Sequence, residues 1–143
     1  MQDVTAAVIV NDAGEVLLAR RAPREKHAGS WEFPGGKVES GETPEDCLAR
    51  EMQEECGVQI GIKDFVAESI YLTPSGGIRL LAYECEILAG KLVMTVHDAY
   101  IWVVPSELLM YNLLPADVPI AEGLPARFGG KIETFVDEEE RRG

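Results

Sequence analysis

Positive charge is scarce in this sequence. Only 13 of its 143 residues are Lys or Arg, against 25 Asp or Glu, so the net charge is −12 with both His neutral. A chain with so little positive charge cannot offer a general basic surface to a nucleic-acid backbone or an anionic membrane. We therefore expect no nucleic-acid polymer and no membrane among its partners, and any bound phosphate must be held by a local site.

Long apolar runs are absent as well. The longest apolar stretches, such as residues 101–105, are far shorter than the roughly 20 residues that cross a bilayer. The first residues do not match a signal peptide, because Gln2 and Asp3 replace its basic start and the apolar run ends at Asn11. These two absences favour a cytoplasmic protein.

Cysteine is sparse: the chain has only Cys47, Cys56 and Cys85. Their number is odd and their spacing does not match that of metal ligands. We expect free, mostly buried thiols in a reducing compartment. The length suits one domain, since a domain usually takes roughly 100 to 200 residues. No repeat or break in composition divides the chain, so we predict a single domain over residues 1–130 and a charged, solvated C-terminal tail over residues 131–143.

Strand and helix signals alternate along the chain. Apolar residues at 4–10 and 15–21 flank turn-forming residues, which predicts a hairpin or strand pair. Further strands are predicted at residues 31–33, 58–62, 65–73, 78–88 and 99–104, with a hairpin turn at 74–77. Helical stretches are predicted from residue 105 and within 114–124. This order predicts an α/β fold whose mixed β-sheet is covered by helices on both faces.

The clearest helix is predicted at residues 44–56. Thr43 is a good N-cap, Pro44 suits the first helical position and Gly57 supplies a C-terminal stop. At about 100° per residue, one face of this helix is apolar. The residues predicted to form this buried face are Leu48, Ala49, Met52 and Cys56.

Three glutamates of this helix, Glu51, Glu54 and Glu55, fall within an arc of roughly 100° at the margin of the apolar face. Like charges four residues apart repel each other, and a divalent cation would reverse that penalty. A solvated acidic helix face is the alternative interpretation. Residues 39–55 hold seven acidic side chains and one basic one, so this segment carries −6, half of the net charge.

The spacing of residues around this helix resembles the Nudix box. The pattern spans 23 residues from Gly36 to Val58, with five residues between Gly36 and Glu42 and seven residues between Glu42 and Arg50-Glu51. Glu54-Glu55 and Gly57 complete it. The likeness extends upstream through residues 31–37 and more loosely to residues 3–125, as in the MutT-type branch of the family.

This resemblance implies a Nudix α/β/α sandwich and hydrolysis of a nucleoside triphosphate to the monophosphate and pyrophosphate, with Mg²⁺, or alternatively Mn²⁺, as cofactor. Oxidised dGTP (8-oxo-dGTP) and CTP or dCTP are the leading substrates. One alternative is hydrolysis of a nucleotide sugar or dinucleoside polyphosphate. Another is a Nudix module that senses a nucleotide without cleaving it. The assembly is predicted to be a monomer or homodimer.

The resemblance also assigns residues to roles. The implied metal ligands are the backbone carbonyl of Gly35 and the side chains of Glu51, Glu54 and Glu55. Glu42 and Arg50 form a supporting pair for catalysis, while Lys37 faces the phosphates or the attacking water. Arg21 matches a position that contacts phosphate, although a surface Arg is an equal alternative.

Asp117 matches a position where relatives place an Asp or Asn against the base, and its alternative role is the N-cap of the last helix. The strand residues Trp31, Tyr71, Ile78 and Leu80 are either pocket or core residues.

The general base is the least determined role. Glu51 is the first candidate, because metal-bound water can lose its proton to a carboxylate near neutral pH. Many relatives carry a further glutamate on the loop before the late strand, but this chain has Val96 there. The neighbouring His97 or Asp98 could substitute, and His97 could equally be a residue of the pocket wall.

Overall fold

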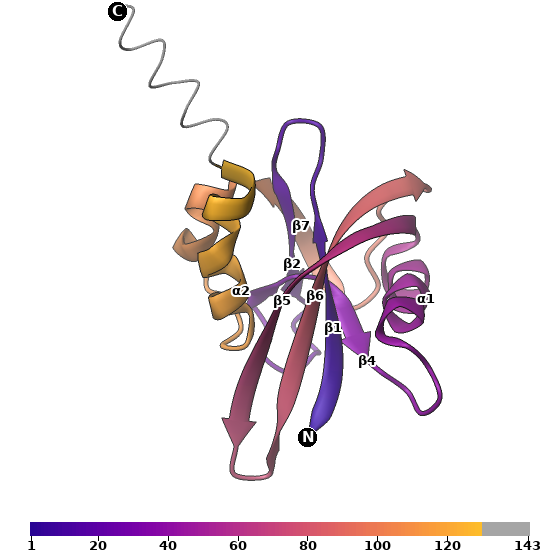
Figure 1. Cartoon of the computed structure of the whole chain (residues 1–143), viewed down its shortest axis with the longest axis vertical. Coiled ribbons are helices and arrows are strands. Elements are labelled where there is room, and N and C mark those ends of the chain that lie inside the picture. The colour runs from indigo at the N-terminus through magenta and orange to yellow at the C-terminus, as the bar shows by residue number, and fades with distance from the viewer. Residues whose placement is uncertain (130–143) are drawn as a thin grey trace, which may run out of the picture.

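Seven strands form two β-sheets in the computed structural model, which describes residues 1–129 (Figure 1). The larger sheet has the order β4-β1-β6-β5, formed by Gly35–Lys37, Gln2–Ile9, Gly76–Ala89 and Gln59–Thr73. In it β1 runs parallel to β6, and the other pairs are antiparallel. The smaller, antiparallel sheet has the order β3-β2-β7, formed by Trp31–Glu32, Val16–Arg21 and His97–Val103. The predicted α/β class with a mixed sheet is confirmed.

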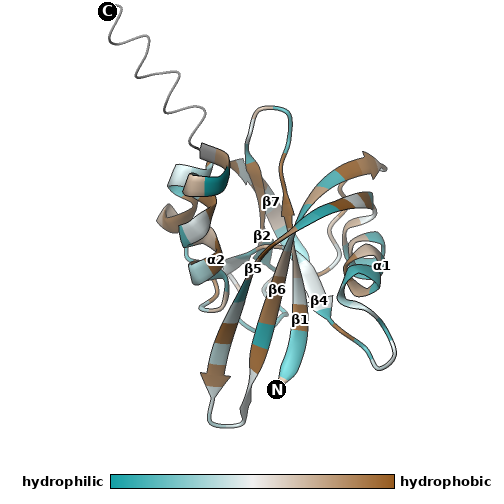
Figure 2. Cartoon of the chain, in the orientation of Figure 1, coloured by the Kyte–Doolittle hydropathy of each residue, from teal (hydrophilic) through white to brown (hydrophobic). Residues whose placement is uncertain are grey.

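Helices cover the sheets from opposite sides (Figure 1). Helix α1 (Pro44–Cys56) lies on one side, and α2 (Asp117–Leu124) lies on the other, after a 3₁₀ helix at Pro105–Met110 and before a short π-helical turn at Pro125–Gly129. Apolar residues are concentrated on the strands and α2, whereas α1 shows hydrophilic residues (Figure 2). No helix in the described part of the chain is long and apolar enough to cross a membrane.

Two hydrophobic clusters hold these layers together. Successive strand residues point to opposite faces, so Val16 and Leu18 of β2 pack in the cluster that contains Leu124 of α2. Between them, Leu17 packs in the other cluster with Leu48 of α1. Burial of apolar side chains on both faces of the central strands therefore fixes the α/β/α layering.

The predicted pairing of the first two strands is wrong. The chain does turn where expected, since the Asn11 backbone N–H donates to the Glu15 carbonyl at 3.0 Å. However, β1 and β2 share only one isolated bridge, between Val10 and Val16, and then enter different sheets. Both strands are apolar on both faces, so each is buried within its own sheet.

Three other segments differ in detail from the sequence prediction. The strands predicted at 58–62 and 65–73 are one strand, β5, whose pairing with β6 is irregular near Ile62, Phe65 and Ala67. The hairpin turn at 74–77 is confirmed. The helical stretch from Pro105 is a 3₁₀ helix, and the predicted tail at residues 131–143 lies outside the described residues.

Helix α1 has the predicted boundaries and caps. The Thr43 hydroxyl accepts a hydrogen bond from the Asp46 backbone N–H at 3.1 Å, and Gly57 adopts a left-handed φ of 71° that ends the helix. The predicted buried face is wrong at Ala49, which is exposed, because Cys47 is buried in its place. The sheet-facing arc thus runs from Cys47 to Cys56 and includes Glu51 and Glu55. All three cysteines are free and buried, as predicted.

We expect the Thr43→Ala variant to lose about 1 kcal/mol of unfolding free energy, because it leaves an N-terminal N–H of α1 without its side-chain acceptor. Thr43→Ser keeps the hydroxyl and is the matched control, which should stay close to the wild type. Urea unfolding followed by circular dichroism measures both. Equal losses in the two variants would contradict the capping role.

Candidate active site

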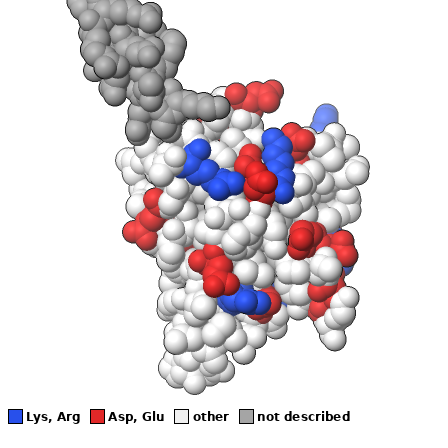
Figure 3. Space-filling view, in the orientation of Figure 1, with Lys and Arg blue, Asp and Glu red and all other residues white. Residues whose placement is uncertain are grey.

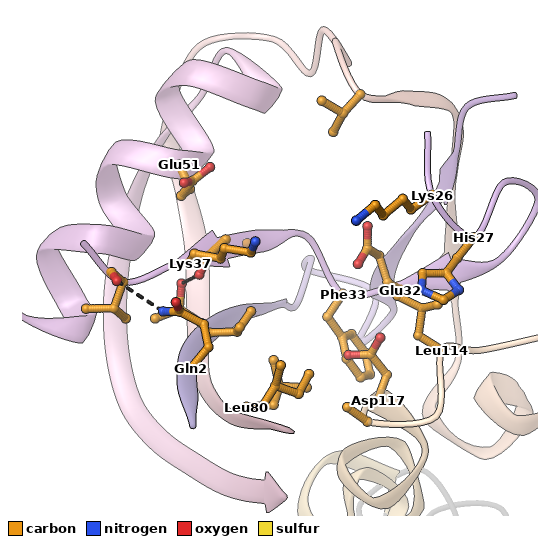
Figure 4. A pocket seen from close by; sticks show the side chains of 18 of the residues that line it. Gln2, Lys26, His27, Glu32, Phe33, Lys37, Glu51, Leu80, Leu114 and Asp117 are labelled. Carbon is orange, nitrogen blue, oxygen red and sulfur yellow. Dashed lines mark hydrogen bonds between the residues drawn. The ribbon is translucent and has the colours of Figure 1, made fainter. Parts of the chain in front are cut away.

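A cavity of about 910 Å³ lies between α1 and the start of α2 (Figure 4). Strands β1, β4 and β6 contribute to its wall. Six of the residues to which the resemblance assigns a catalytic, metal-binding or substrate-binding role line it: Arg21, Gly35, Lys37, Glu51, Glu55 and Asp117. Glu42, Arg50 and Glu54 are not among its lining residues. The structure therefore brings the implied phosphate, metal and base positions to one cavity, with three residues of the box beside it.

Two glycines allow the close approaches on which this wall depends. A Cβ at Gly36 would collide with the Glu51 carboxyl group, and a Cβ at Gly35 would collide with the Thr5 carbonyl of the paired strand β1. The Thr5 carbonyl belongs to the backbone of a paired strand and cannot yield, whereas the Glu51 side chain would have to leave its position. The glycines thus permit Glu51 to lie against the backbone of β4.

Glu51 and Glu55 form an acidic pair on the sheet-facing side of α1. Burial first and the neighbouring charge of Glu51 second raise the pKa of Glu55 to about 7. The Glu51 side chain is only 13% exposed. A second negative charge is therefore unfavourable here at neutral pH, and a divalent cation would relieve it.

Glu54 lies apart from this pair. Its side chain is 60% exposed, and Oε2 accepts a hydrogen bond from Nη1 of Arg50 at 3.2 Å. Within residues 1–129, no three His, Cys, Asp or Glu side chains are arranged closely enough to hold a metal ion. The donor types nevertheless fit a hard cation, because Glu51, Glu55 and the nearby Gly35 carbonyl all offer oxygen. The metal role of Glu54 stays a prediction.

Arg50 connects the acidic residues of the box. Its Nε and Nη2 atoms donate to the two carboxylate oxygens of Glu42 at 2.9 and 2.8 Å, and Nη1 donates to Glu51 Oε1 at 3.0 Å. The pKa of Glu42 is lowered to about 2, chiefly by the hydrogen bonds from Arg50 and secondly by a hydrogen bond from the backbone N–H of Glu39. The predicted supporting pair is thus in contact and holds one oxygen of Glu51.

Arg21 and Lys37 provide positive charge beside the cavity. Lys37 extends its ammonium group into it (Figure 4). Arg21 is tied to the protein: Nε donates to the Lys26 carbonyl at 2.6 Å, and Nη1 donates to Glu32 at 2.8 Å. Elsewhere on the face that Figure 3 shows, Lys and Arg occur in small groups next to acidic residues. Arg21 and Lys37 therefore place positive charge where a phosphate in the cavity would lie.

Asp117 lies at the other end of the cavity and is 3% exposed. Burial raises the pKa of its carboxyl well above the usual range, and the charge of Glu32 acts in the same direction. The alternative of a helix N-cap is wrong, because Ala116 occupies the cap position and no side chain caps α2. A neutral Asp117 can donate one hydrogen bond and accept others.

Sequence reasoning missed Glu32 as a residue of the site. It lines the cavity beside Phe33 and lies near Asp117 (Figure 4). Glu32 accepts hydrogen bonds from both Arg21 and His97. The sequence feature that could have indicated a role for Glu32 is its position as a single carboxylate between two bulky aromatic residues, Trp31 and Phe33, on a short strand.

The residues around the predicted base position separate in the structure. Val96 lines the cavity, whereas His97 and Asp98 do not. Asp98 forms an ion pair with Arg20 at 2.8 Å, with the two side chains 34% and 41% exposed. The His97 side chain is 1% exposed. A direct catalytic role for either residue has no geometric support, and Glu51 stays the predicted general base.

The four aromatic and apolar candidates also separate into residues that line the cavity and one that does not. Tyr71, Ile78 and Leu80 line the cavity. Trp31 packs edge-to-face against Tyr111, with ring centroids 5.5 Å apart, and is a partly buried residue at the edge of the core. The pocket interpretation therefore holds for three of the four residues.

Comparisons with known proteins agree with this geometry. The family model of the NUDIX domain matches residues 1–124. The chain is 39% identical over 126 residues to a protein of Escherichia coli K12 named CTP pyrophosphohydrolase, covering 88% of this chain and 93% of that protein. It is 40% identical over 119 residues to the putative 8-oxo-dGTP diphosphatase 2 of Mycobacterium tuberculosis, covering 81% and 82%.

Solved structures show the same fold. The solution structure of the E. coli ORF135 protein superposes with a TM-score of 0.77 at 38% identity, covering 88% of this chain and 89% of that one. The crystal structure of the MutT protein from Methanosarcina mazei Go1 gives a TM-score of 0.76 at 28% identity, covering 91% and 94%.

The bond between Glu42 and Arg50 predicts a pH-dependent stability. Because the folded state lowers the pKa of Glu42 from 4.5 to about 2, ionised Glu42 stabilises the fold above about pH 4.5, and this contribution is lost as the pH falls towards 2. We expect Glu42→Gln to be less stable than the wild type at pH 7, with the difference shrinking below pH 4.5. Urea unfolding between pH 7 and 3 measures it.

Glu107→Gln is the matched control, since Glu107 is exposed on the 3₁₀ helix. It should differ little from the wild type at any pH. A loss in Glu42→Gln that stays constant from pH 7 to 3 would show that ionisation of Glu42 does not stabilise the fold.

Proposed function

This chain belongs to the Nudix family, and on that premise we propose that it is a divalent-metal-dependent pyrophosphohydrolase of nucleoside triphosphates. The reaction adds water to phosphorus, breaks one phosphoanhydride bond and yields the nucleoside monophosphate and pyrophosphate. The observation that carries this proposal is the acidic pair Glu51 and Glu55 on one wall of the cavity. Its volume of about 910 Å³ lies within the range of ligand pockets.

The residues divide the work of phosphoryl transfer. Displacement at phosphorus needs positioning and neutralisation of charge, with little covalent chemistry from the protein. Mg²⁺, or alternatively Mn²⁺, would be held by Glu51, Glu55 and the Gly35 carbonyl, with Glu54 beside them, and it would supply charge neutralisation and a more acidic water. Glu51 accepts the proton of the attacking water. Lys37 and Arg21 bind phosphate oxygens, and Arg50 with Glu42 holds Glu51 in place.

The opposite end of the cavity selects the base. Phe33, Ile78 and Leu80 provide apolar walls, and the two carboxyl groups of Glu32 and Asp117 provide polar contacts. An ionised Glu32 accepts hydrogen bonds, while a neutral Asp117 both donates and accepts. This set suits a base that presents an exocyclic amino group, as cytosine and 8-oxoguanine do. We propose CTP or dCTP and 8-oxo-dGTP as the substrate candidates.

A cytoplasmic location and a monomeric or homodimeric state complete the proposal. Both rest on the sequence alone.

A screen for pyrophosphate release tests the activity directly. With Mg²⁺, we expect turnover of 8-oxo-dGTP or of CTP and dCTP above that of the other triphosphates. Glu51→Gln removes the proton acceptor and should lower kcat by about a hundredfold or more. Gln53→Ala, at an exposed position on the same helix, is the matched control and should keep full activity. Background turnover for all triphosphates in the wild type would contradict the proposed function.

Binding of Mg²⁺ should release a proton below neutral pH. Since the pKa of Glu55 is about 7 without metal, most Glu55 carries a proton at pH 6 and must lose it to bind the cation. At pH 8 it is already ionised, so the affinity for Mg²⁺ should rise up to about pH 7 and then level off. Titration calorimetry in two buffers of different ionisation enthalpy counts the protons.

The Glu55→Gln variant has no such proton and is the control for this titration. It should bind Mg²⁺ more weakly and release no proton at pH 6. An equal proton count at pH 6 and pH 8 in the wild type would exclude Glu55 as the titrating ligand.

A further inference from the structure

His97 is a buried histidine that the proposed reaction leaves without a role. It is the first residue of β7, and its side chain is 1% exposed. The pairing of β2 with β7 shifts by one residue between Arg20 and Arg21, so that Arg21 lies opposite His97 and not Asp98. Such a bulge re-aims side chains. Here Arg21 and His97 both reach Glu32 on β3, while Asp98 lies at the surface.

The two side chains contact the same oxygen of Glu32. His97 Nε2 lies 2.9 Å from Glu32 Oε2, and Arg21 Nη1 donates to that same atom at 2.8 Å. Among the described residues, the other oxygen, Oε1, accepts no hydrogen bond from the protein. One carboxylate oxygen is therefore fixed by two donors, and the second is left to accept a bond from a ligand in the cavity.

The surroundings of His97 select one tautomer. Its Nδ1 is buried without a hydrogen-bond partner. A hydrogen on Nδ1 would be a buried donor with no acceptor, whereas a hydrogen on Nε2 points to a carboxylate oxygen. The imidazole is thus a fixed donor from Nε2 to Glu32.

We propose that His97 is a positioning residue for base recognition. Acting with Arg21, it holds the Glu32 carboxylate so that Oε1 meets the exocyclic amino group of the substrate base at the end of the cavity that contains Asp117. This inference rests on the proposed function, since it assigns a determinant of specificity to that same site. His97 is accordingly not the general base.

Two substitutions of His97 separate positioning from packing. His97→Phe keeps a ring but has no donor, whereas His97→Gln keeps an N–H near the position of Nε2. We expect His97→Phe to raise KM for the preferred triphosphate about tenfold with little change in kcat. The analogue that lacks the amino group, UTP for CTP or 8-oxo-dITP for 8-oxo-dGTP, should be affected far less. His97→Gln should restore much of the preference.

A double-mutant cycle with Glu32→Gln tests the connection to Glu32. If His97 acts through Glu32, the loss of preference in the double variant should equal that of Glu32→Gln alone. Tyr100→Phe, on an exposed residue of the same strand, is the control and should behave as the wild type. Independent, multiplying effects of the two substitutions, or equal loss on both nucleotides, would overturn the inference.

The tautomer of His97 can be read without any turnover. In the wild type, ¹H–¹⁵N correlations should show a protonated Nε2 and an unprotonated Nδ1 for His97. The opposite tautomer would overturn the inference even in an active enzyme. Absence of hydrolysis in the wild type would instead overturn the proposed function, while the nitrogen shifts would still decide whether His97 donates to Glu32.

Discussion

The placement of two carboxylates on the sheet-facing side of α1 is the constraint on which the site depends. Glu51 and Glu55 lie within the arc of the helix that also carries Leu48 and Met52 into the core. Burial first and the nearby charge of Glu51 second raise the pKa of Glu55. Two neighbouring residues offset the repulsion between the two carboxylates: Arg50 donates a hydrogen bond to Glu51, and Gly36 leaves room for the Glu51 carboxyl group. A bound divalent cation would complete the compensation.

At the far end of the cavity, burial and neighbouring charged groups act on a second pair of carboxyl groups, Asp117 and Glu32. Asp117 is buried near Glu32, and its pKa is raised, whereas Glu32 is held by Arg21 and His97. One acid is thus favoured as a neutral donor and its neighbour as an acceptor. Between the two acidic ends, Lys37 extends into the cavity. A chain with a net charge of −12 can bind a polyanion in this way, through a few local cations and a metal ion.

Features set by local interactions could be predicted from the sequence, and those set by distant strands could not. The caps at Thr43 and Gly57 define α1 within its own segment. The helix pattern predicted that Glu51 and Glu55 lie beside the buried face, but Glu54 is exposed, and Cys47 is buried where Ala49 was expected. The separation of β1 and β2 depends on pairing with β6 and β7, far along the chain. The contact of His97 with Glu32 arises from a bulge between strands, which no local pattern encodes.

The most direct test of the central claim is a crystal structure with Mn²⁺ and a non-hydrolysable nucleoside triphosphate, with the metal located by its anomalous scattering. Our account predicts a metal ion about 2.0 to 2.3 Å from oxygens of Glu51 and Glu55, and near the Gly35 carbonyl, bridging them to the phosphates. A metal ion bound by the phosphates alone, or at acidic residues outside the cavity, would contradict it.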